Sequence, residues 1–148
     1  MIEMTLELAE RAAAAALARA KEIGAAMSVV VVDESGRTVL MLRGDGASFL
    51  SLDTARAKAV TAANFRRSTR ELGESAGANA LFWQSAAAVS GGDILISMGG
   101  APIRREGRVI GAVGCGGGQG VQDDDCAVTG AQAAAVRTEA SRAGPGAK

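Results

Sequence analysis

The chain has 148 residues, enough for one domain with a sizeable core but too few for two well-packed domains. Its 16 basic and 16 acidic residues balance, so no overall field attracts nucleic acid or an acidic membrane surface, and we expect neither as a partner. Histidine and tyrosine are both absent from the sequence, which excludes a Ser-His-Asp or Cys-His catalytic pair, a histidine-based zinc or iron site, and phenolic acid–base chemistry.

Cysteine usage and hydropathy indicate where such a chain would work. Two cysteines, Cys115 and Cys126, are too few for a disulfide framework. The first residues lack the basic flank and apolar run of a signal peptide, and no stretch approaches the roughly 20 apolar residues needed to cross a bilayer. We therefore expect a soluble protein of the reducing cytoplasm.

The start of the chain favours a helix followed by a hairpin. Apolar residues at helical spacing predict a helix from Thr5 to Ile23, with Thr5 as its N-cap and Gly24 placed to close its C-terminus. Two β-branched runs, residues 27–32 and 37–43, flank a short turn that contains glycine. A turn of this kind between two strands is typical of a β-hairpin.

A mostly helical region is expected next. A second helix is predicted over about residues 51–65. The segment Ser68-Thr69-Arg70-Glu71 matches a capping box, so a short helical turn should begin there. Residues 73–77 should form a loose connection, and residues 78–89 a partly helical one.

The last part of the chain predicts a second hairpin and a closing helix. Residues 93–98 contain the β-prone run ILISM and are expected to form the third strand. Residues 105–108 are typical of a hairpin turn that leads into a last strand over residues 108–114. A final helix should cover about residues 121–142, and residues 143–148 are expected to be a flexible tail.

This order of elements predicts the fold class. Sequential hairpins favour an antiparallel sheet, and amphipathic helices before, between and after them can cover its faces. Internal repeats and low-complexity linkers are both lacking in the sequence. We therefore predict an α+β fold: a single domain over residues 1–142 with a central antiparallel sheet of about four or five strands.

The glycine-rich segment before the final helix is the first candidate site. It reads Gly114-Cys115-Gly116-Gly117-Gly118-Gln119-Gly120 and lies where phosphate-cradling loops occur. The dinucleotide pattern G-x-G-x-x-G fails at Gln119, and no P-loop lysine completes the alternative. Three aspartates at positions 123–125 would also repel a phosphate. Nucleotide binding is therefore not expected, and the glycines either line another kind of site or simply permit a tight strand exit.

Thiol and carboxylate groups near this segment could carry chemistry. Cys115 lies close to a helix N-terminus, where a thiolate is stabilised, although the aspartates oppose this effect and most free cysteines are packed hydrophobes. We expect Cys126, on the apolar side of the final helix, to be packed. The aspartates could supply a general base, hold a metal or simply cap the helix. We assign Asp123 as the candidate base and predict no metal site.

Polar residues elsewhere could complete a binding site. Arg43 and Asp45 lie in a glycine-rich turn after the first hairpin. Lys58 and Thr61 are spaced i and i+3 on the second helix and can therefore reach a common point. An anionic small molecule could be held by Arg43 and Lys58, or these groups could simply form surface ion pairs.

Several short motifs together resemble a known family. They are Asp33-Glu34-Ser35-Gly36, Leu42-Arg43-Gly44-Asp45-Gly46-Ala47, Lys58-Ala59-Val60-Thr61-Ala62, Gly99-Gly100-Ala101-Pro102-Ile103, Gly107, Gly111-Ala112-Val113-Gly114 and Gln122-Asp123. In this combination the chain resembles the GlcG/HbpS-like family, which includes the C-terminal domain of the PduO cobalamin adenosyltransferases. The resemblance covers residues 5–137.

The resemblance implies a fold and a partner. It implies a compact three-layer α-β-α domain of profilin-like or PAS-like type, assembled as a homo-oligomer. Some relatives bind haem, and one group assists a two-component redox sensor. This chain departs from the family at Gly44, where methionine is common, and at Cys115-Gly116-Gly117, where an aliphatic residue followed by Ser-Gly is usual. Because it has no histidine, haem ligation would need a cysteine, a methionine or an oxygen donor.

Taken together, these residues define one predicted site. The catalytic candidates are Cys115 and Asp123. The ligand-binding candidates are Arg43, Asp45, Lys58, Thr61, Gly114, Gly116, Gly117 and Gln122.

Two functions are compatible with this site. The first is a small-ligand-binding or sensing module of the family, without histidine ligation of haem. The second is a cofactor-independent isomerase, lyase or hydrolase that acts on a small anionic organic metabolite, with Asp123 or Cys115 moving a proton or attacking the substrate. We expect no required cofactor, and we expect haem to be disfavoured by the absence of histidine.

Overall fold

A four-stranded antiparallel sheet forms the centre of the protein. The computed structural model describes residues 3–136. The strands are β1 (Ser28–Asp33), β2 (Thr38–Arg43), β3 (Gly100–Arg105) and β4 (Arg108–Gly116), and they lie in the order β2-β1-β4-β3. The two hairpins therefore join through their buried, valine-rich strands β1 and β4, while β2 and β3 form the edges.

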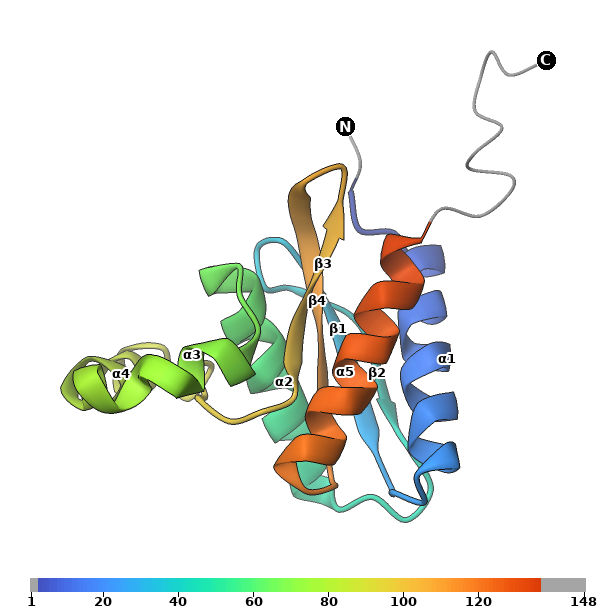
Figure 1. The fold of residues 1–148 in the computed structure, drawn as a ribbon, viewed down its shortest axis with the longest axis horizontal. Helices are drawn as coiled ribbons and strands as arrows, with labels where there is room; N and C mark the ends of the chain where they lie inside the picture. Colours follow the sequence, from blue (N-terminus) through green and yellow to red (C-terminus); the bar gives the residue numbers. More distant parts are fainter. Residues whose placement is uncertain (1–2, 137–148) are drawn as a thin grey trace.

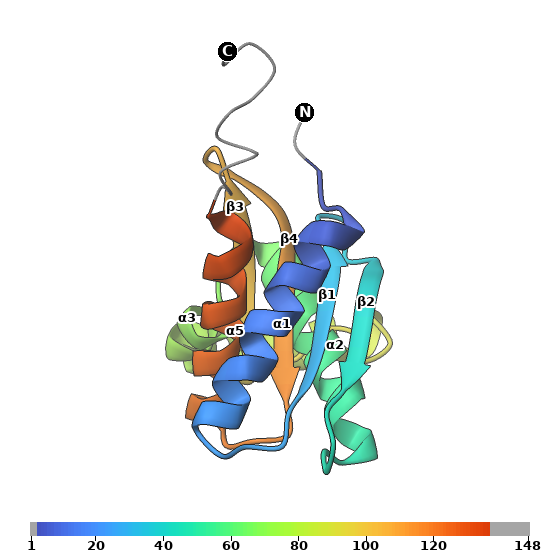
Figure 2. The same ribbon diagram turned by 90° about the vertical axis from the view of Figure 1, so that its right-hand side faces the viewer.

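Helices cover both faces of this sheet (Figure 1). On one face, α1 (Leu6–Glu22) and α5 (Gly120–Ala135) lie side by side, as Figure 2 shows. On the opposite face, α2 (Phe49–Phe65) packs against β1 and β4. The core consequently has two apolar layers, one around Val29, Val31 and Val113 and one around Val30, Val32 and Ala112. The predicted α+β fold, with three α-β-α layers, is confirmed.

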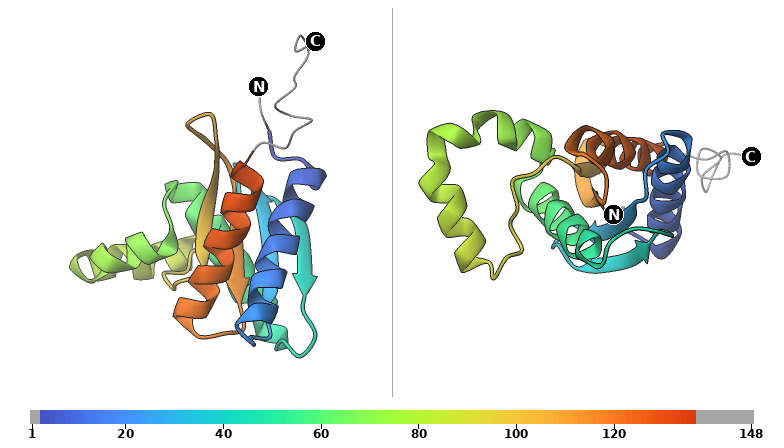
Figure 3. Two further views of the ribbon diagram at one scale, coloured as in Figure 1. Left: turned by 45° about the vertical axis from the view of Figure 1, so that its right-hand side comes forward. Right: turned by 90° about the horizontal axis from the view of Figure 1, so that it is seen from below.

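A helical arm leaves this domain between α2 and β3. It consists of α3 (Thr69–Ala76), one short 3-10 turn and α4 (Ala80–Val89), and it curves away from the layers in Figure 3. Edge-to-face contacts among Phe65, Phe82 and Trp83 connect the arm to the end of α2. None of the residues of α4, all of which are described, is buried.

The helix ends follow their sequence signals. The Thr5 hydroxyl accepts a hydrogen bond from the Leu8 N–H at 3.1 Å, and Gly24 has a positive φ of 71° just beyond α1. The Ser68 hydroxyl accepts one from the Glu71 N–H at 3.1 Å, which is one half of the predicted capping box, while the Glu71 side chain pairs with Arg67 instead of reaching back to Ser68. Within residues 3–136, no helix combines the length and apolar character needed to span a membrane.

The third strand is not where the β-prone run predicts it. Residues 93–98 form a half-buried connection in which the Leu95 N–H donates to the Thr61 hydroxyl at 2.9 Å, and the strand begins only at Gly100. The turn before β4 explains this difference. Its two residues, Glu106 and Gly107, both have positive φ, at 53° and 76°, and the turn brings Arg105 opposite Arg108. A two-residue turn fixes the hairpin register, so the partner of β4 must come directly before it.

Two further boundaries differ from the prediction or fall outside the structure. Residues 73–77 are not loose, because α3 continues to Ala76 and a 3-10 turn follows directly. The helix α5 ends at Ala135. The predicted continuation to residue 142 and the predicted tail, residues 143–148, lie outside the described residues.

Candidate functional site

A pocket of about 410 Å³ lies where β4 ends and α5 begins. We call it the glycine-loop pocket. Three segments that are distant in sequence form it: the start of α2, the connection before β3, and the glycine loop. Its lining residues are Ser48, Leu50, Ser51, Thr54, Lys58, Leu95, Ser97, Gly117, Gly118, Gly120 and Asp123.

A buried ion pair forms the floor of the glycine-loop pocket. The Lys58 Nζ lies 2.8 Å from the Asp123 Oδ2, and each side chain is only 5% exposed. Lys58 also donates to the carbonyl oxygen of Cys115 at 3.0 Å, and the Asp123 Oδ1 accepts from the Gly118 N–H at 2.9 Å. Each charge therefore has two polar partners, as buried charges require. Two predicted site residues from different helices meet here.

Burial changes the proton affinity of Asp123. Removal from water raises the pKa of Asp123 above its ordinary value, although the hydrogen bonds from Lys58 and Gly118 oppose the change. A carboxylate with a raised pKa is a better proton acceptor than an exposed one. The pocket floor thus holds a basic carboxylate directly beside a fixed positive charge.

Close backbone packing keeps the pair in place. Gly99 has a φ of 126°, and a Cβ at this position would lie 2.8 Å from the Asp123 Cβ and 2.7 Å from the Cys115 carbonyl oxygen. A side chain at Gly99 would therefore push Lys58 and Asp123 out of position. The pair depends on a glycine that is not itself part of the pocket lining.

Sequence reasoning missed most of the hydroxyl-bearing wall. Ser48, Ser51 and Thr54 come from the first turns of α2, and Ser97 faces them from the connection before β3. The signal was available, because spacings of three and four residues place Ser48, Ser51, Thr54 and then Lys58 along one side of a helix. The position of Ser97 could not be deduced from the sequence, since it depends on how the arm returns to the sheet.

Several predicted ligand-binding residues instead support the pocket. Thr61 is buried and donates to the Ala57 carbonyl at 2.7 Å while accepting from Leu95. The Gln122 side chain accepts from the Gln119 N–H at 2.9 Å and caps α5. Gly114 and Gly116 lie against the backbone of α2, where a Cβ would collide with carbonyl oxygens. Of the predicted glycines, Gly117 lines the pocket.

The turn after the first hairpin lies at the same end of the sheet but does not enter this pocket. Gly44 and Gly117 both approach the backbone of residues 26–27, so the two loops are neighbours. The side chains of Arg43 and Asp45 are exposed and form no ion pair with any residue in the described range. The joint grip of one anion by Arg43 and Lys58 is therefore not assembled within a single chain.

The thiol of Cys115 faces away from the pocket. Neighbouring residues of a strand point to opposite faces, so Cys115 points into the apolar layer under α1 and α5, while Gly114 and Gly116 face α2. The thiol is fully buried, and burial raises its pKa well above the ordinary value. Cys126 is also buried, and its pKa is raised to about 11. These positions favour packing roles for both cysteines.

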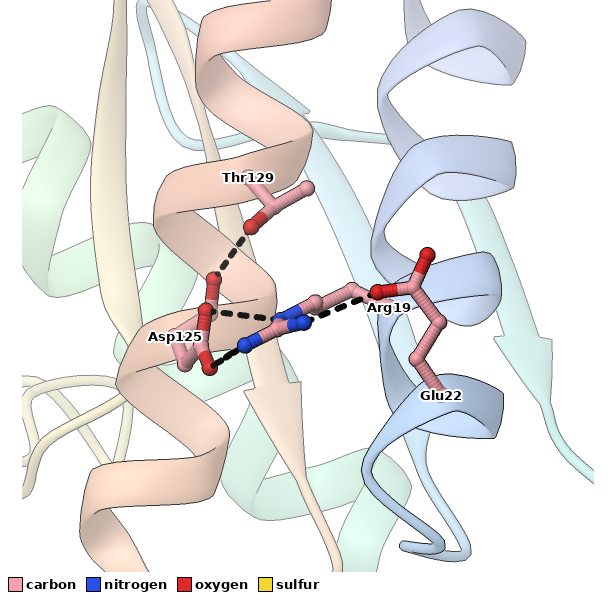
Figure 4. Close-up of polar contacts among 4 residues, drawn as sticks. All are labelled: Arg19, Glu22, Asp125 and Thr129. Atoms are coloured by element: carbon pink, nitrogen blue, oxygen red, sulfur yellow. Dashed lines mark hydrogen bonds and ion pairs between the residues drawn. The ribbon is translucent and has the colours of Figure 1, made fainter.

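The three aspartates of α5 point in three directions. Asp123 meets Lys58, Asp124 lies 3.6 Å from Arg70, and Asp125 accepts hydrogen bonds from Arg19 at 2.9 and 3.1 Å, which joins α1 to α5 (Figure 4). The guanidinium of Arg19 lowers the pKa of Asp125. Within residues 3–136, no group of three or more acidic, cysteine or histidine side chains converges as a metal site would require.

Fold and site together define a class of protein: a three-layer α-β-α domain with a polar pocket at one end of its sheet. The sequence matches the family described as "Haem degrading protein HbpS-like" over residues 4–132. The chain therefore belongs to the HbpS-like family, as the motif resemblance predicts.

Relatives of known sequence agree with this assignment. An uncharacterised 15.0 kDa protein from the dhaT-dhaS intergenic region of Citrobacter freundii is 38% identical over 120 residues, which cover 81% of this chain and 84% of that protein. The corrinoid adenosyltransferase PduO of the same organism is 32% identical over 124 residues, which cover 84% of this chain but 37% of PduO.

Solved structures show the same fold. A double mutant of HbpS from Streptomyces reticuli has a TM-score of 0.77 at 34% identity, covering 89% of this chain and 87% of that one. The PduOC:haem complex has a TM-score of 0.80 at 27% identity, covering 89% and 95% respectively.

Proposed function

We propose that this chain is a small-ligand-binding module and that the glycine-loop pocket is its binding site. The observation that supports this best is the composition of the pocket: hydroxyl groups on the walls and a buried Lys58–Asp123 pair as its floor. Packing alone would favour apolar side chains over a buried ion pair, because removing charges from water is costly. A pocket with a few convergent polar groups is the usual form of a small-molecule site.

The wall chemistry suggests a small polar ligand. The two floor charges neutralise each other, so the hydroxyl groups of the walls determine which ligand is preferred more than the floor does. The hydroxyls of Ser48 and Ser97 can donate or accept hydrogen bonds, and the Thr54 hydroxyl, which donates to the Ser51 carbonyl, can still accept one. The pocket also adjoins the N-terminus of α5, whose dipole favours a negatively polarised group. We infer a hydroxy acid or polyol of a few carbon atoms.

Binding can be measured by titration calorimetry with lactate and glycerol as probes and propionate, which lacks the hydroxyl, as the comparison. Thr54→Val removes one wall hydroxyl and should weaken binding by about two- to tenfold. Thr129→Val is the matched control, because Thr129 also donates to a helix carbonyl but lies outside the pocket. Equal effects of the two variants, or tighter binding of propionate, would contradict the proposal.

A second candidate function is catalysis of a proton transfer in the same pocket. The observation in its favour is the raised pKa of Asp123 beside Lys58. Asp123 would accept a proton from a substrate, and Lys58 would stabilise the negative charge that develops. The Gly118 N–H already donates to Asp123, so it is not available for that charge. Recovery of each probe unchanged after incubation supports binding, whereas conversion of one of them supports the enzyme.

Haem must be considered as a ligand because one similar structure is a PduOC:haem complex. The residues of the glycine-loop pocket do not fit haem, since apart from Leu50 and Leu95 they are hydroxyls, glycines and an ion pair rather than an apolar slot with a strong axial ligand. The sequence has no histidine, and both thiols are enclosed in the core. We propose that haem is not the ligand of this pocket.

Haem titration followed by absorbance tests this directly. We expect a broad, non-saturating band typical of weak surface association. A sharp Soret band that saturates at one haem per chain would overturn the prediction. In that case, Met41→Leu and Met98→Leu would identify the ligand, because Met41 is exposed and Met98 is half-buried beside Gly120.

We also propose that the chain forms a homo-oligomer through its helical arm. The sequence of α4, ALFWQSAAAV, has no charged residue, and Leu81 and Val89 are 78% and 89% exposed. Exposed apolar clusters of this kind typically mark interaction surfaces. Coverage by a second copy would remove this surface from water.

The oligomer proposal predicts a specific effect of charge on the arm. Leu81→Asp combined with Val89→Asp should shift the protein to a lower mass in light scattering after size exclusion, because two carboxylates would be buried in the interface. Val121→Asp is the matched control, since Val121 is an exposed valine on α5, away from the arm. An unchanged mass for the double variant would rule out α4 as the interface.

A further inference from the structure

A second pocket, separate from the proposed binding site, lies between the arm and the sheet. We call it the arm groove. It has a volume of about 500 Å³ and lies among α3, β3 and α5. Its apolar floor includes Ala101, Val128 and Ala131. Among the described residues, none lines both this groove and the glycine-loop pocket.

The main polar feature of the arm groove is Asp124. The residue is only 7% exposed. Its Oδ1 is enclosed and accepts no hydrogen bond from any described residue. The other oxygen, Oδ2, lies 3.6 Å from the Arg70 guanidinium, which is longer than a good charge-assisted hydrogen bond. Buried carboxylates normally accept several hydrogen bonds. Asp124 therefore needs a donor, and the described residues do not supply one.

The surroundings of Asp124 favour a cation as that donor. The groove is lined by three carboxylates, from Asp124, Glu71 and Glu74, and by two guanidiniums, from Arg70 and Arg104. Arg104 already donates to the Arg66 carbonyl at 2.7 Å. Arg70 is an exposed side chain shared between Asp124 and Glu74, so it can swing outward. An anion would instead be placed against a buried carboxylate.

We propose that the arm groove binds a small primary alkylammonium compound. Its ammonium group displaces the Arg70 guanidinium from Oδ2 of Asp124 and donates to Oδ1 as well, and its alkyl chain lies on Ala101, Val128 and Ala131. Ammonium supplies three donors in a small volume. This site is independent of the glycine-loop pocket, so its existence does not depend on the function proposed above.

The test uses the full chain, labelled with 15N and titrated with n-pentylammonium chloride. We expect saturable shifts of the amide signals of Ala101, Val128 and Ala131. Uncharged 1-pentanol should bind about tenfold more weakly or worse, because it lacks the charge that Asp124 recognises. The near-isosteric variant Asp124→Asn should bind n-pentylammonium about tenfold more weakly than the wild type does.

A blocking variant separates loss of recognition from loss of structure. Val128→Phe places a larger side chain one helical turn from Asp124, on a residue that the alkyl chain covers, and should abolish the shifts, whereas Ala133→Leu, on the same helix but outside the lining, should not. Equal affinity for pentanol, wild-type affinity of Asp124→Asn, or shifts confined to Gly117 and Gly118 would each overturn the proposal.

Discussion

Replacing Lys58 with methionine should lower the free energy of unfolding by about 3–5 kcal/mol, because it leaves the Asp123 carboxylate buried without its cation. In the folded protein, the Nζ of Lys58 lies 2.8 Å from the Asp123 Oδ2, and both side chains are 5% exposed. Urea unfolding followed by circular dichroism measures the loss. The difference in unfolding free energy between the wild type and Lys58→Met should shrink as the pH falls, since protonation of Asp123 removes the unpaired charge.

The same helix provides a matched control. Arg56 lies two positions before Lys58, and its ion pair with Asp93 is shorter, at 2.6 Å, but partly exposed. Arg56→Met should therefore cost less than about 1 kcal/mol. The double variant Lys58→Met, Asp123→Asn should recover part of the loss. If Lys58→Met and Arg56→Met cost the same, the buried pair has no special structural importance.

Substitution of Gly114 by alanine should destabilise the protein by about 3 kcal/mol or more, although the change adds a single methyl group. A Cβ at Gly114 would coincide with the Ala55 carbonyl oxygen and lie close to the Ala59 N–H group. Both groups belong to the backbone of α2, so relief requires the whole helix to move off the sheet. That movement would also displace Lys58, and we expect weaker ligand binding with the lost stability.

Gly77→Ala is the control for the glycine prediction. Gly77 has helical dihedrals, with φ −59° and ψ −33°, and no atom lies within 4 Å of a Cβ built there. Alanine should therefore stabilise the protein by about 0.4–1 kcal/mol, by restricting the unfolded chain. Wild-type stability of Gly114→Ala would mean that the close approach of α2 to β4 is not required.

Local signals in the sequence predicted most of the fold. The caps at Thr5 and Ser68 and both hairpin turns are determined by neighbouring residues, so they could be deduced without any tertiary contact. The predicted position of the third strand was wrong. It rested on the β-propensity of residues 93–98 and ignored the register that the turn at Glu106 and Gly107 imposes. Propensity is a weak signal compared with hairpin geometry.

The candidate site was predictable only in part, because side-chain direction depends on tertiary structure. Lys58, Asp123 and Gly117 meet in one pocket. The direction of Cys115 follows from the alternation along β4 once Gly114 and Gly116 are known to face α2. The sequence alone could not show whether Arg43 reaches the pocket. In the structure its side chain is exposed, where it can contact solvent or a neighbouring copy of the chain.

Amide chemical-shift mapping tests most directly whether the glycine-loop pocket is the binding site. The 15N-labelled chain is titrated with whichever hydroxy acid or polyol binds best in calorimetry. We expect saturable shifts clustered at Lys58, Ser97, Gly117, Gly118 and Asp123, with the arm groove unaffected. Shifts that saturate elsewhere on the protein while these five amides stay unchanged would contradict the account.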